Sequence, residues 1–398
     1  MKKFISVLMV VVMLFGLTAC NGAGSGNAAA SKIKVGLICL HDENSTYDKN
    51  FIDGFKGACE GLGVESIIKT NIPEGQECYE TACDLADAGC QYIFADSFGH
   101  EDYMIAAAKE YPDVQFCHAT GTQAHTAGLD NFHNAFAAIY EGRYLAGIAA
   151  GMKLNEMIAN GEITEDQAKM GYVGAFTYAE VISGYTSFFL GARSVCPSVT
   201  MEVTFTGSWY DETAEKEGAN KLIEDGCVLI SQHADSMGAP TACETAGVPN
   251  ISYNGSTAAA CPETFIVSSR INWEPYFRYS ICCVIDQKAI DTDWVGTLTD
   301  KSVVLTELGT AAAEGTQEAI DAATEQLANG TLHVFDTSTF TVDGSVLSSY
   351  QADVDTDEAY TPDHEVIVDG YFDESGEDFR SAPYFDVKID GITLLDAE

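Results

Sequence analysis

From residue 32 onward, short apolar runs alternate with longer segments in which apolar residues recur at helical spacing. In the first part of the chain, the runs that predict strands are 33–38, 64–68, 92–95 and 114–118. The segments between them that predict helices are 50–61, 77–88 and 101–110. Strands that alternate with helices in this way favour a parallel sheet with right-handed crossovers.

The same alternation then restarts and predicts a second unit. Its predicted helices are 136–152, 181–193, 213–224 and 239–246, and its predicted strands are 171–175, 201–205, 228–231, 250–253 and 265–268. Beyond residue 291 the pattern weakens to a helix at 313–329, some strand character at 333–342 and an acidic, loop-rich stretch from Tyr350. We therefore predict an α/β protein with two Rossmann-like lobes. Ligands of such open sheets lie beyond the carboxyl ends of the strands, and in two lobes those ends can face each other across a cleft.

The first twenty residues have the pattern of an export signal. Lys2 and Lys3 precede the apolar run 4–17, and the tetrapeptide Leu-Thr-Ala-Cys then ends at Cys20. A charged start, an apolar core and small residues before a cut are typical of a secretory signal peptide. The run is too short to cross a bilayer core of ~30 Å as a helix. We predict a lipoprotein signal peptide at 1–19, lipidation of Cys20 and a body anchored on the extracytoplasmic face of the cell membrane. An ordinary signal peptide is the alternative.

Length and charge narrow the possible functions. At 398 residues, the chain is too long for one ordinary core and suits two domains. It has 60 acidic and 20 basic residues, for a net charge of −40. A surface this anionic repels phosphate backbones, so we expect no nucleic-acid partner. After Cys20, residues up to 31 are only Gly, Ala, Ser and Asn, which predicts that 20–31 is a lipidated flexible tether.

The chain contains 13 cysteines, an unusual number for an exported protein. Several of them, including Cys39, Cys117 and Cys227, lie on predicted buried elements, where a free thiol behaves as a small apolar group. Cys282 and Cys283 are adjacent and cannot easily bond to each other. No C-x-x-C pair is present, which argues against a zinc site. We predict mostly reduced, buried thiols, with a disulfide framework as the alternative.

Sequence motifs of common enzymes and metal sites are missing. The chain has no hydrolase nucleophile elbow, no H-E-x-x-H and no P-loop. Residues 353–357 imitate the start of a calcium loop, but Glu358 replaces its glycine and His364 replaces its last glutamate. We therefore expect no metal, no cofactor and no enzymatic activity. A surface enzyme acting on nucleosides remains an alternative, since folding can bring catalytic groups together.

Several segments together resemble one known family. They are 94–100 (FADSFGH), 110–114 (EYPDV), 141–151 (EGRYLAGIAAG), 191–195 (GARSV), 206–211 (TGSWYD) and 272–277 (NWEPYF). In this order and spacing, they make the chain similar to the substrate-binding lipoproteins of the basic membrane protein family, which are extracytoplasmic receptors of some ABC importers. The resemblance covers residues 32 to about 345.

This resemblance implies a type I periplasmic-binding-protein fold with three crossovers between the lobes, near residues 131, 267 and 293. It also implies purine nucleosides as ligands, an ABC permease as partner and a monomer. The implied division gives 32–131 plus 267–292 to lobe 1 and 132–266 plus 293–345 to lobe 2. The remaining residues, 346–398, are expected to form an acidic C-terminal extension.

Two aromatic residues are candidates for holding a flat ligand. Tyr47 lies after the first predicted strand, and Trp209 lies after a strand of the second unit. Stacking of a base on an aromatic ring contributes roughly 1–3 kcal/mol, and the family's clamping aromatics fall at these two positions. The alternative is that both rings are ordinary core residues.

Polar candidates must then bind the edge of the ligand, because a buried donor left unpaired costs about 1–3 kcal/mol. The candidates at strand ends are Asp48, Ser97, His118, Glu180, Asp211, His233, Asp235 and Asn254, and Phe98 is a further candidate contact. For Asp48 and Asp211 the alternative role is a helix cap. For His118 it is a buried, hydrogen-bonded imidazole.

Three positions depart from the pattern of nucleoside-binding members of the family. His118 replaces an aspartate, Asn254 and Ser256 replace two acidic residues, and Ile271 replaces a lysine. These losses weaken the case for binding a ribose. They leave a free purine base, or a sugar, a flavin-like heterocycle or a signalling molecule, as alternatives to a nucleoside.

Overall fold

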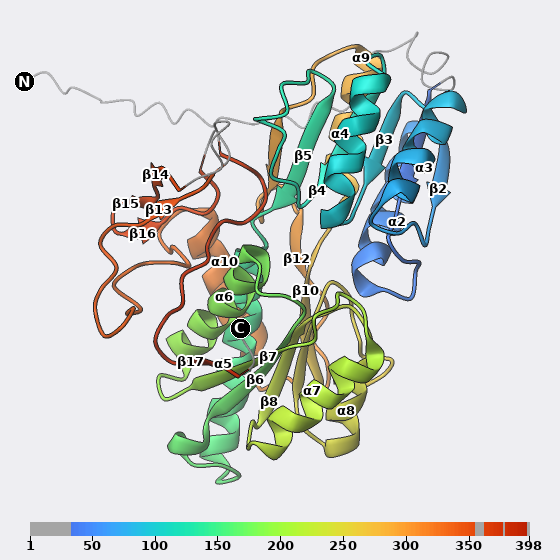
Figure 1. The fold of residues 1–398 in the computed structure, drawn as a ribbon. Helices are drawn as coiled ribbons and strands as arrows, with labels where there is room; N and C mark the ends of the chain where they lie inside the picture. Colours follow the sequence, from blue (N-terminus) through green and yellow to red (C-terminus); the bar gives the residue numbers. More distant parts are fainter. Residues whose placement is uncertain (1–32, 355–361, 377–378, 396–398) are drawn as a thin grey trace, which may run out of the picture.

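The computed structural model describes residues 33–354, 362–376 and 379–395, and it contains two parallel sheets flanked by helices (Figure 1). The first sheet has the order β11-β5-β4-β3-β1-β2, and all of its pairings are parallel. Its strands are β1 (Lys34–Ile38), β2 (Glu65–Lys69), β3 (Tyr92–Ala95), β4 (Gln115–Ala119), β5 (Phe132–Ala137) and β11 (Asp293–Gly296). Its helices are α2 (Thr46–Leu62), α3 (Gln76–Asp87), α4 (Glu101–Glu110) and α9 (Glu274–Asp286), with the short helix η1 (Phe98–His100).

The second sheet has the order β12-β10-β9-β8-β6-β7-β17. Only β12 runs antiparallel to its neighbour. The strands are β6 (Lys169–Gly174), β7 (Thr200–Phe205), β8 (Leu229–His233), β9 (Asn250–Tyr253), β10 (Phe265–Ile271), β12 (Val303–Leu305) and β17 (Ile392–Leu394). The helices are α5 (Ile139–Ala159), α6 (Ala179–Val195), α7 (Glu212–Glu224), α8 (Gly238–Ala246) and α10 (Thr316–Ala328), with the short helix η2 (Glu165–Gln167).

The alternating pattern therefore predicted the fold class correctly, but it missed one central strand. Phe132–Ala137 forms β5, whereas the pattern placed a helix from residue 136 and no strand before it. His133 and Asn134 interrupt the apolar run of this buried strand, and the Asn134 amide donates to Glu101 Oε1 at 3.0 Å. The predicted strand at 333–342 is also wrong, since residues 336 and 342 make only isolated bridges.

The chain passes between the two sheets three times within the described residues, after β5, after β10 and after β11. The expected boundaries near 131, 267 and 293 come several residues too early. β5 and β11 pair with each other in the first sheet, through Asp293 and Asn134, and so do not belong to the second lobe. Conversely, all of β10 belongs to the second sheet.

The backbones of helices α5 and α6 are in close contact at two glycines. A Cβ atom added at Gly147 would lie 2.0 Å from the carbonyl oxygen of Phe188, and one at Gly191 would lie 2.0 Å from that of Tyr144. These glycines lie in the segments 141–151 and 191–195 that carried the family resemblance. They let the two helix backbones touch beneath the second sheet.

The C-terminal segment, which comprises the described residues 362–376 and 379–395, is part of the folded body. Phe372 and Phe385 are buried in the apolar core of the second lobe, and β17 adds an edge strand beside β7. The Ser381 backbone N–H and hydroxyl each donate to Asp293 Oδ1 at 2.6 Å, which joins this segment to β11 of the first sheet. The described part of the expected acidic C-terminal extension is thus built into the fold, because apolar residues are interspersed among the acidic ones.

The twelve cysteines of the described region form no disulfide with one another, and ten of them are buried. None of the helices in the described ranges is both long and apolar enough for a membrane span. The predicted signal peptide, Cys20 and tether lie outside the described residues, as does Glu358 of the rejected calcium loop.

Candidate ligand-binding site between the lobes

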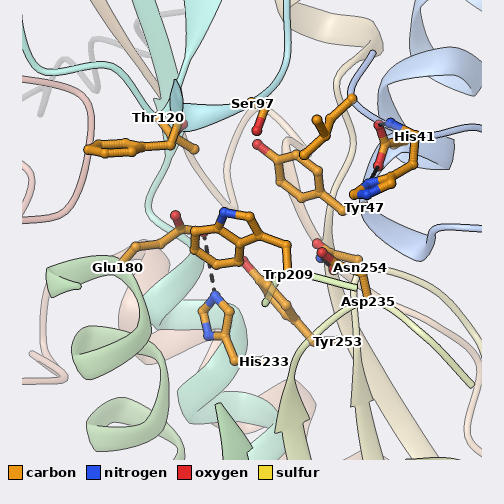
Figure 2. Close-up of a pocket in the computed structure, with 13 residues that line it drawn as sticks. His41, Tyr47, Ser97, Thr120, Glu180, Trp209, His233, Asp235, Tyr253 and Asn254 are labelled. Atoms are coloured by element: carbon orange, nitrogen blue, oxygen red, sulfur yellow. Dashed lines mark hydrogen bonds and ion pairs between the residues drawn. The ribbon is translucent and has the colours of Figure 1, made fainter. Parts of the chain in front are cut away.

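A pocket lies where the two lobes meet (Figure 2), and the empty space in and around it is about 390 Å³ when open solvent is included. The first lobe contributes the loops after β1, β3 and β4 together with the starts of α2 and η1. The second lobe contributes the ends of β8 and β9 with the residues just after them, the loop after β7 and the start of α6. Because the strands of each sheet are mostly parallel, their carboxyl ends gather at one edge. The lining residues are Leu40, His41, Tyr47, Asp48, Ser97, Phe98, Thr120, Glu180, Trp209, His233, Asp235, Tyr253 and Asn254.

Nine of the eleven predicted ligand-binding residues line this pocket: Tyr47, Asp48, Ser97, Phe98, Glu180, Trp209, His233, Asp235 and Asn254. His118 and Asp211 do not. Sequence reasoning missed Leu40, His41, Thr120 and Tyr253. Tyr253 ends a strand that the pattern had predicted, so its position at a carboxyl end was available as a signal. Thr120 has a left-handed backbone with φ 63°, which no sequence pattern here foretold.

His118 and Asp211 have the structural roles that the sequence left open as alternatives. The His118 ring is fully buried, its Nε2 lies 2.7 Å from the carbonyl oxygen of Ser97, and burial lowers its pKa. Asp211 is the N-cap of α7 and accepts hydrogen bonds from the backbone N–H groups of Thr213 and Ala214. Neither residue lines the pocket.

The two predicted clamping aromatics come from opposite lobes and project into the same space (Figure 2). The Tyr47 hydroxyl donates to the carbonyl oxygen of Asp96 at 2.7 Å, and its ring packs edge-on against Phe51. Trp209 packs edge-on against Phe176 at a centroid distance of 5.0 Å. Each ring is thus held by its own lobe, and a planar ligand can contact both rings only when the lobes are together.

The lobes are together in this structure. The Thr46 N–H and hydroxyl at the start of α2 both lie 3.2 Å from the carbonyl oxygen of Asp235, to which they donate. The Asn50 amide donates to the carbonyl oxygen of Asn254 at 2.7 Å. At the rim, the exposed ring of Phe98 in the first lobe lies 5.4 Å from that of Tyr178 in the second. These contacts define a closed arrangement.

Asp235 and Asn254 form a buried polar pair at one side of the pocket. The Asn254 amide donates to Asp235 Oδ1 at 2.9 Å. Burial, reinforced by the nearby Asp48 carboxylate, raises the pKa of Asp235 well above its usual range. A neutral Asp235 presents an O–H donor as well as an acceptor. The left-handed backbone of Asn254 (φ 66°), a conformation that asparagine tolerates better than most residues, directs it here.

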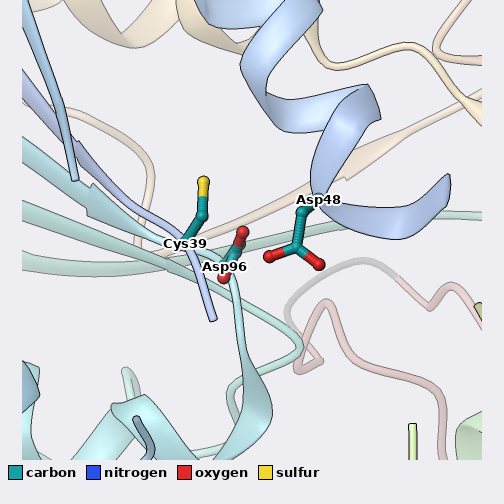
Figure 3. Close-up of side chains that lie close together, drawn as sticks. All are labelled: Cys39, Asp48 and Asp96. Carbon is teal, nitrogen blue, oxygen red and sulfur yellow. The ribbon is translucent and has the colours of Figure 1, made fainter. Parts of the chain in front are cut away.

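Two buried carboxyl groups, those of Asp48 and Asp96, lie close together near Cys39 (Figure 3). Burial, and then the charge of Asp48, raise the pKa of Asp96 well above its usual range. Burial opposes ionisation of Asp48 as well, but hydrogen bonds from His41 and Ser45 outweigh it and lower its pKa. An ionised Asp48 beside a neutral Asp96 is the consistent assignment.

The same pair, with Cys39, is the one group in the described residues whose ligand atoms lie close enough to hold a metal ion, all within 4.8 Å. The chemistry of these groups does not fit a metal. Both Asp48 oxygens already accept hydrogen bonds, and burial raises the pKa of the Cys39 thiol well above its usual value. The cluster therefore serves to support Tyr47 and the loop after β1.

The pocket combines two aromatic faces with donors and acceptors along its edge. Solved ABC transporter solute-binding proteins share this fold; the one from Aeropyrum pernix K1 superposes with a TM-score of 0.65 at 17% identity, over 76% of this chain and 93% of that chain. At this identity the likeness shows the fold, two α/β lobes with a pocket between them.

The family model described as "ABC transporter substrate-binding protein PnrA-like" matches residues 38–336, and the chain belongs to this family, Bmp. Its role is to bind a substrate, so the chain is a binding protein and not an enzyme. The purine-binding protein of Brucella abortus is 32% identical over 66% of this chain and 72% of its own length. A putative ABC transporter glucose-binding protein of Haloferax volcanii is 33% identical over 64% of this chain, a match that spans 61% of the relative.

Proposed function

We propose that this receptor captures a purine, as a nucleobase or a nucleoside, by closing its two lobes over it. The observation that carries the proposal is the position of Tyr47 and Trp209, which line one pocket from opposite lobes. Asp235, Asn254 and Glu180 supply polar groups for the edge of the ring. The name of the Brucella relative, a purine-binding protein, gives independent support. The closed state that the ligand stabilises is the one that an ABC permease accepts.

Among purines, the residues at the pocket edge favour a free base. His118 is held behind the lining by the carbonyl group of Ser97, so it does not replace the missing aspartate. Asn254 donates one amide N–H to Asp235, and Ile271 is buried. These positions therefore add no charged group for the ribose hydroxyls.

Thermal shift with a panel of purine bases, nucleosides and sugars tests the proposal. A ligand at ~100 times its dissociation constant adds about 2.7 kcal/mol of stability. Trp209→Ala and Tyr47→Ala should each weaken purine binding by about 5- to 150-fold, the equivalent of one lost stacking contact. Tyr103→Ala, on α4 away from the pocket, is the matched control and should bind as the wild type does. Silence of every purine in the panel would refute the assignment.

A sugar is the second candidate, because the Haloferax relative carries the name of a glucose-binding protein. The same panel separates the two. Stabilisation by glucose, with all purines inactive and little effect of Trp209→Ala, would favour the sugar.

We further propose that the mature protein is a monomer, lipidated at Cys20 and held on the extracytoplasmic face of the membrane. The tetrapeptide Leu-Thr-Ala-Cys, which ends at Cys20, supports the lipid anchor. Cys20→Ser should release the protein from the membrane fraction while ligand binding stays unchanged. Wild-type protein that is fully released by a salt wash would contradict the lipid anchor.

A further inference from the structure

Arg143, on α5, is completely buried beneath the second lobe's side of the pocket. Its guanidinium lies over the rings of Tyr172, Phe188 and Tyr253, at 4.9 to 5.3 Å from their centroids. Its hydrogen bonds within the described residues go to hydroxyl and carbonyl oxygens, and none goes to a carboxylate. These acceptors are the Ser252 carbonyl oxygen, Ser269 Oγ, Tyr172 Oη and Ser231 Oγ. A buried cation with no acid beside it is costly to maintain, which points to a role beyond packing.

From Arg143, a chain of hydrogen bonds leads to the pocket. The Arg143 Nη2 donates to the Tyr172 hydroxyl oxygen at 3.1 Å. The same oxygen lies 3.2 Å from His233 Nδ1, and His233 Nε2 lies 3.4 Å from Glu180 Oε1. Glu180 lines the pocket, and Figure 2 shows its carboxylate close to Trp209 with the contact to His233 dashed.

The donor and acceptor in each of these hydrogen bonds follow from Arg143, the first residue of the series. A guanidinium can only donate, so Tyr172 accepts from Arg143 and keeps its own O–H for another partner. The described acceptor within reach of that O–H is His233 Nδ1, and an unpaired buried hydroxyl would cost about 1–3 kcal/mol. Nδ1 is then unprotonated, the proton of the neutral imidazole is on Nε2, and this N–H donates to Glu180. Burial also lowers the pKa of His233, in keeping with a neutral ring.

Glu180 therefore accepts one hydrogen bond from the Nε2–H group of His233. It is in the first turn of α6, where the helix dipole stabilises a negative charge. A carboxylate offers only acceptors. Its oxygen on the pocket side can consequently pair with a donor of the ligand, and it repels a lone pair placed there.

We propose that Arg143, Tyr172 and His233 act as positioning residues that fix Glu180 as an acceptor, so that the receptor selects ligands with an N–H group, from a ring nitrogen or an amino group, at this edge. This inference rests on the proposed function in so far as it names a nitrogen heterocycle. The arrangement of protons in the empty receptor does not depend on that function.

The first test reads the proton positions directly in the ligand-free receptor. Nitrogen-15 NMR of histidine-labelled protein should show His233 as the tautomer protonated at Nε2. Tyr172→Phe should convert it to a mixture of tautomers. Tyr185→Phe is the matched control, because the Tyr185 hydroxyl is buried next to Tyr172 and has no hydrogen-bond partner in the described part of the chain; it should leave the spectrum unchanged. A wild-type His233 protonated at Nδ1 would overturn the proposal.

The second test measures selectivity with adenine, hypoxanthine, guanine and their N-methylated analogues. Glu180→Gln should weaken the preferred base on the order of 10- to 100-fold, the range for a lost bond to a charged group. Glu180→Gln should also reduce the loss of affinity caused by N-methylation at the ligand nitrogen that donates to Glu180. If Glu180→Gln binds the whole panel as the wild type does, the acceptor role is wrong.

Failure of the proposed function is a separate outcome. If no purine binds and glucose does, glucose becomes the probe for the Glu180→Gln comparison, since its hydroxyl groups also donate. Equal glucose affinity of wild type and variant would then overturn the acceptor role. The NMR result decides the proton chain in either case.

Discussion

Buried carboxyl groups in this protein differ in charge because their hydrogen-bond donors differ. Asp48 receives donors from His41 and Ser45 and has a lowered pKa, whereas burial raises the pKa of its neighbour Asp96. Glu374 in the C-terminal segment follows the second pattern. Burial raises its pKa to about 8, although the Ser183 hydroxyl and the Phe385 N–H, the latter at 2.7 Å, both contact its carboxyl group. Such a group holds a proton at neutral pH and links stability to pH.

Glu374 should make the folded protein less stable as pH rises. Its folded pKa of about 8 exceeds its usual 4.5, so the folded state keeps a proton that the unfolded state releases. The contribution is complete below about 4.5 and is lost as pH rises toward about 8. The slope reaches about 1.4 kcal/mol per pH unit at most. Glu374→Gln, which keeps a neutral group able to contact both partners, should lose this slope in chemical-denaturation curves between pH 5 and 8. If the free energy of unfolding depends on pH in the same way in the variant and the wild type, Glu374 does not hold the extra proton.

At the scale of elements, alternating patterns predicted most of the sheet-forming segments, and they failed where polar groups enter buried structure. The hydrophobic pattern did not predict β5 because His133 and Asn134 are polar. Their hydrogen-bond partners, Gln115 and Glu101, come close only in the folded protein. In the site, Tyr47 and Trp209 were predictable because they follow strands. Thr120 was not predictable, because its place depends on an uncommon backbone conformation. The proton chain behind Glu180 joins α5, β6, β8 and α6, and no local spacing encodes it.

The α5–α6 contact gives a prediction in which two effects oppose each other. Alanine has a higher helix propensity than glycine by about 1 kcal/mol, which favours Gly147→Ala. The new Cβ would lie 2.0 Å from a backbone carbonyl that cannot rotate away, and overpacking of this kind costs typically 1–3 kcal/mol or more. We expect Gly147→Ala and Gly191→Ala to lower the free energy of unfolding and the melting temperature.

Gly218→Ala in α7 is the matched control for these variants. Its nearest neighbour would be the Thr204 methyl group at 3.3 Å, a side-chain end that can shift. Its stability should stay within about 1 kcal/mol of wild type or rise. Stabilisation by all three alanines would show that the helices separate without penalty.

On the scale of the whole molecule, the two lobes share a third component, the C-terminal segment. It completes the second core with Phe372 and Phe385, borders the second sheet with β17 and reaches β11 through Ser381. Its acidic composition indicated an extension, but composition does not report how a few apolar side chains are buried. Only the folded chain shows that they belong to a core begun more than two hundred residues earlier.

Truncation after residue 345 should therefore damage the protein. It would expose Phe335 and Phe340, which are buried with Phe385, and remove an edge strand. We expect loss of the cooperative thermal transition or a strongly reduced melting temperature by circular dichroism, together with loss of ligand binding. A chain ending at residue 395 keeps all of the contacts described here and serves as the control. A truncated protein that melts and binds as the full chain does would show that the segment is dispensable.

The bond between Ser381 and Asp293 has a consequence for how the receptor empties. One end of the C-terminal segment is fixed to the second lobe by β17, so separating the lobes either ruptures this bond or pulls the segment away from the helices beneath it. The segment thus acts as a tether between the two lobes, and it is attached away from the residues that line the pocket. Opening of the lobes would therefore have to break this bond or displace the segment, in addition to breaking the contacts at the pocket, although neither Ser381 nor Asp293 lines the pocket.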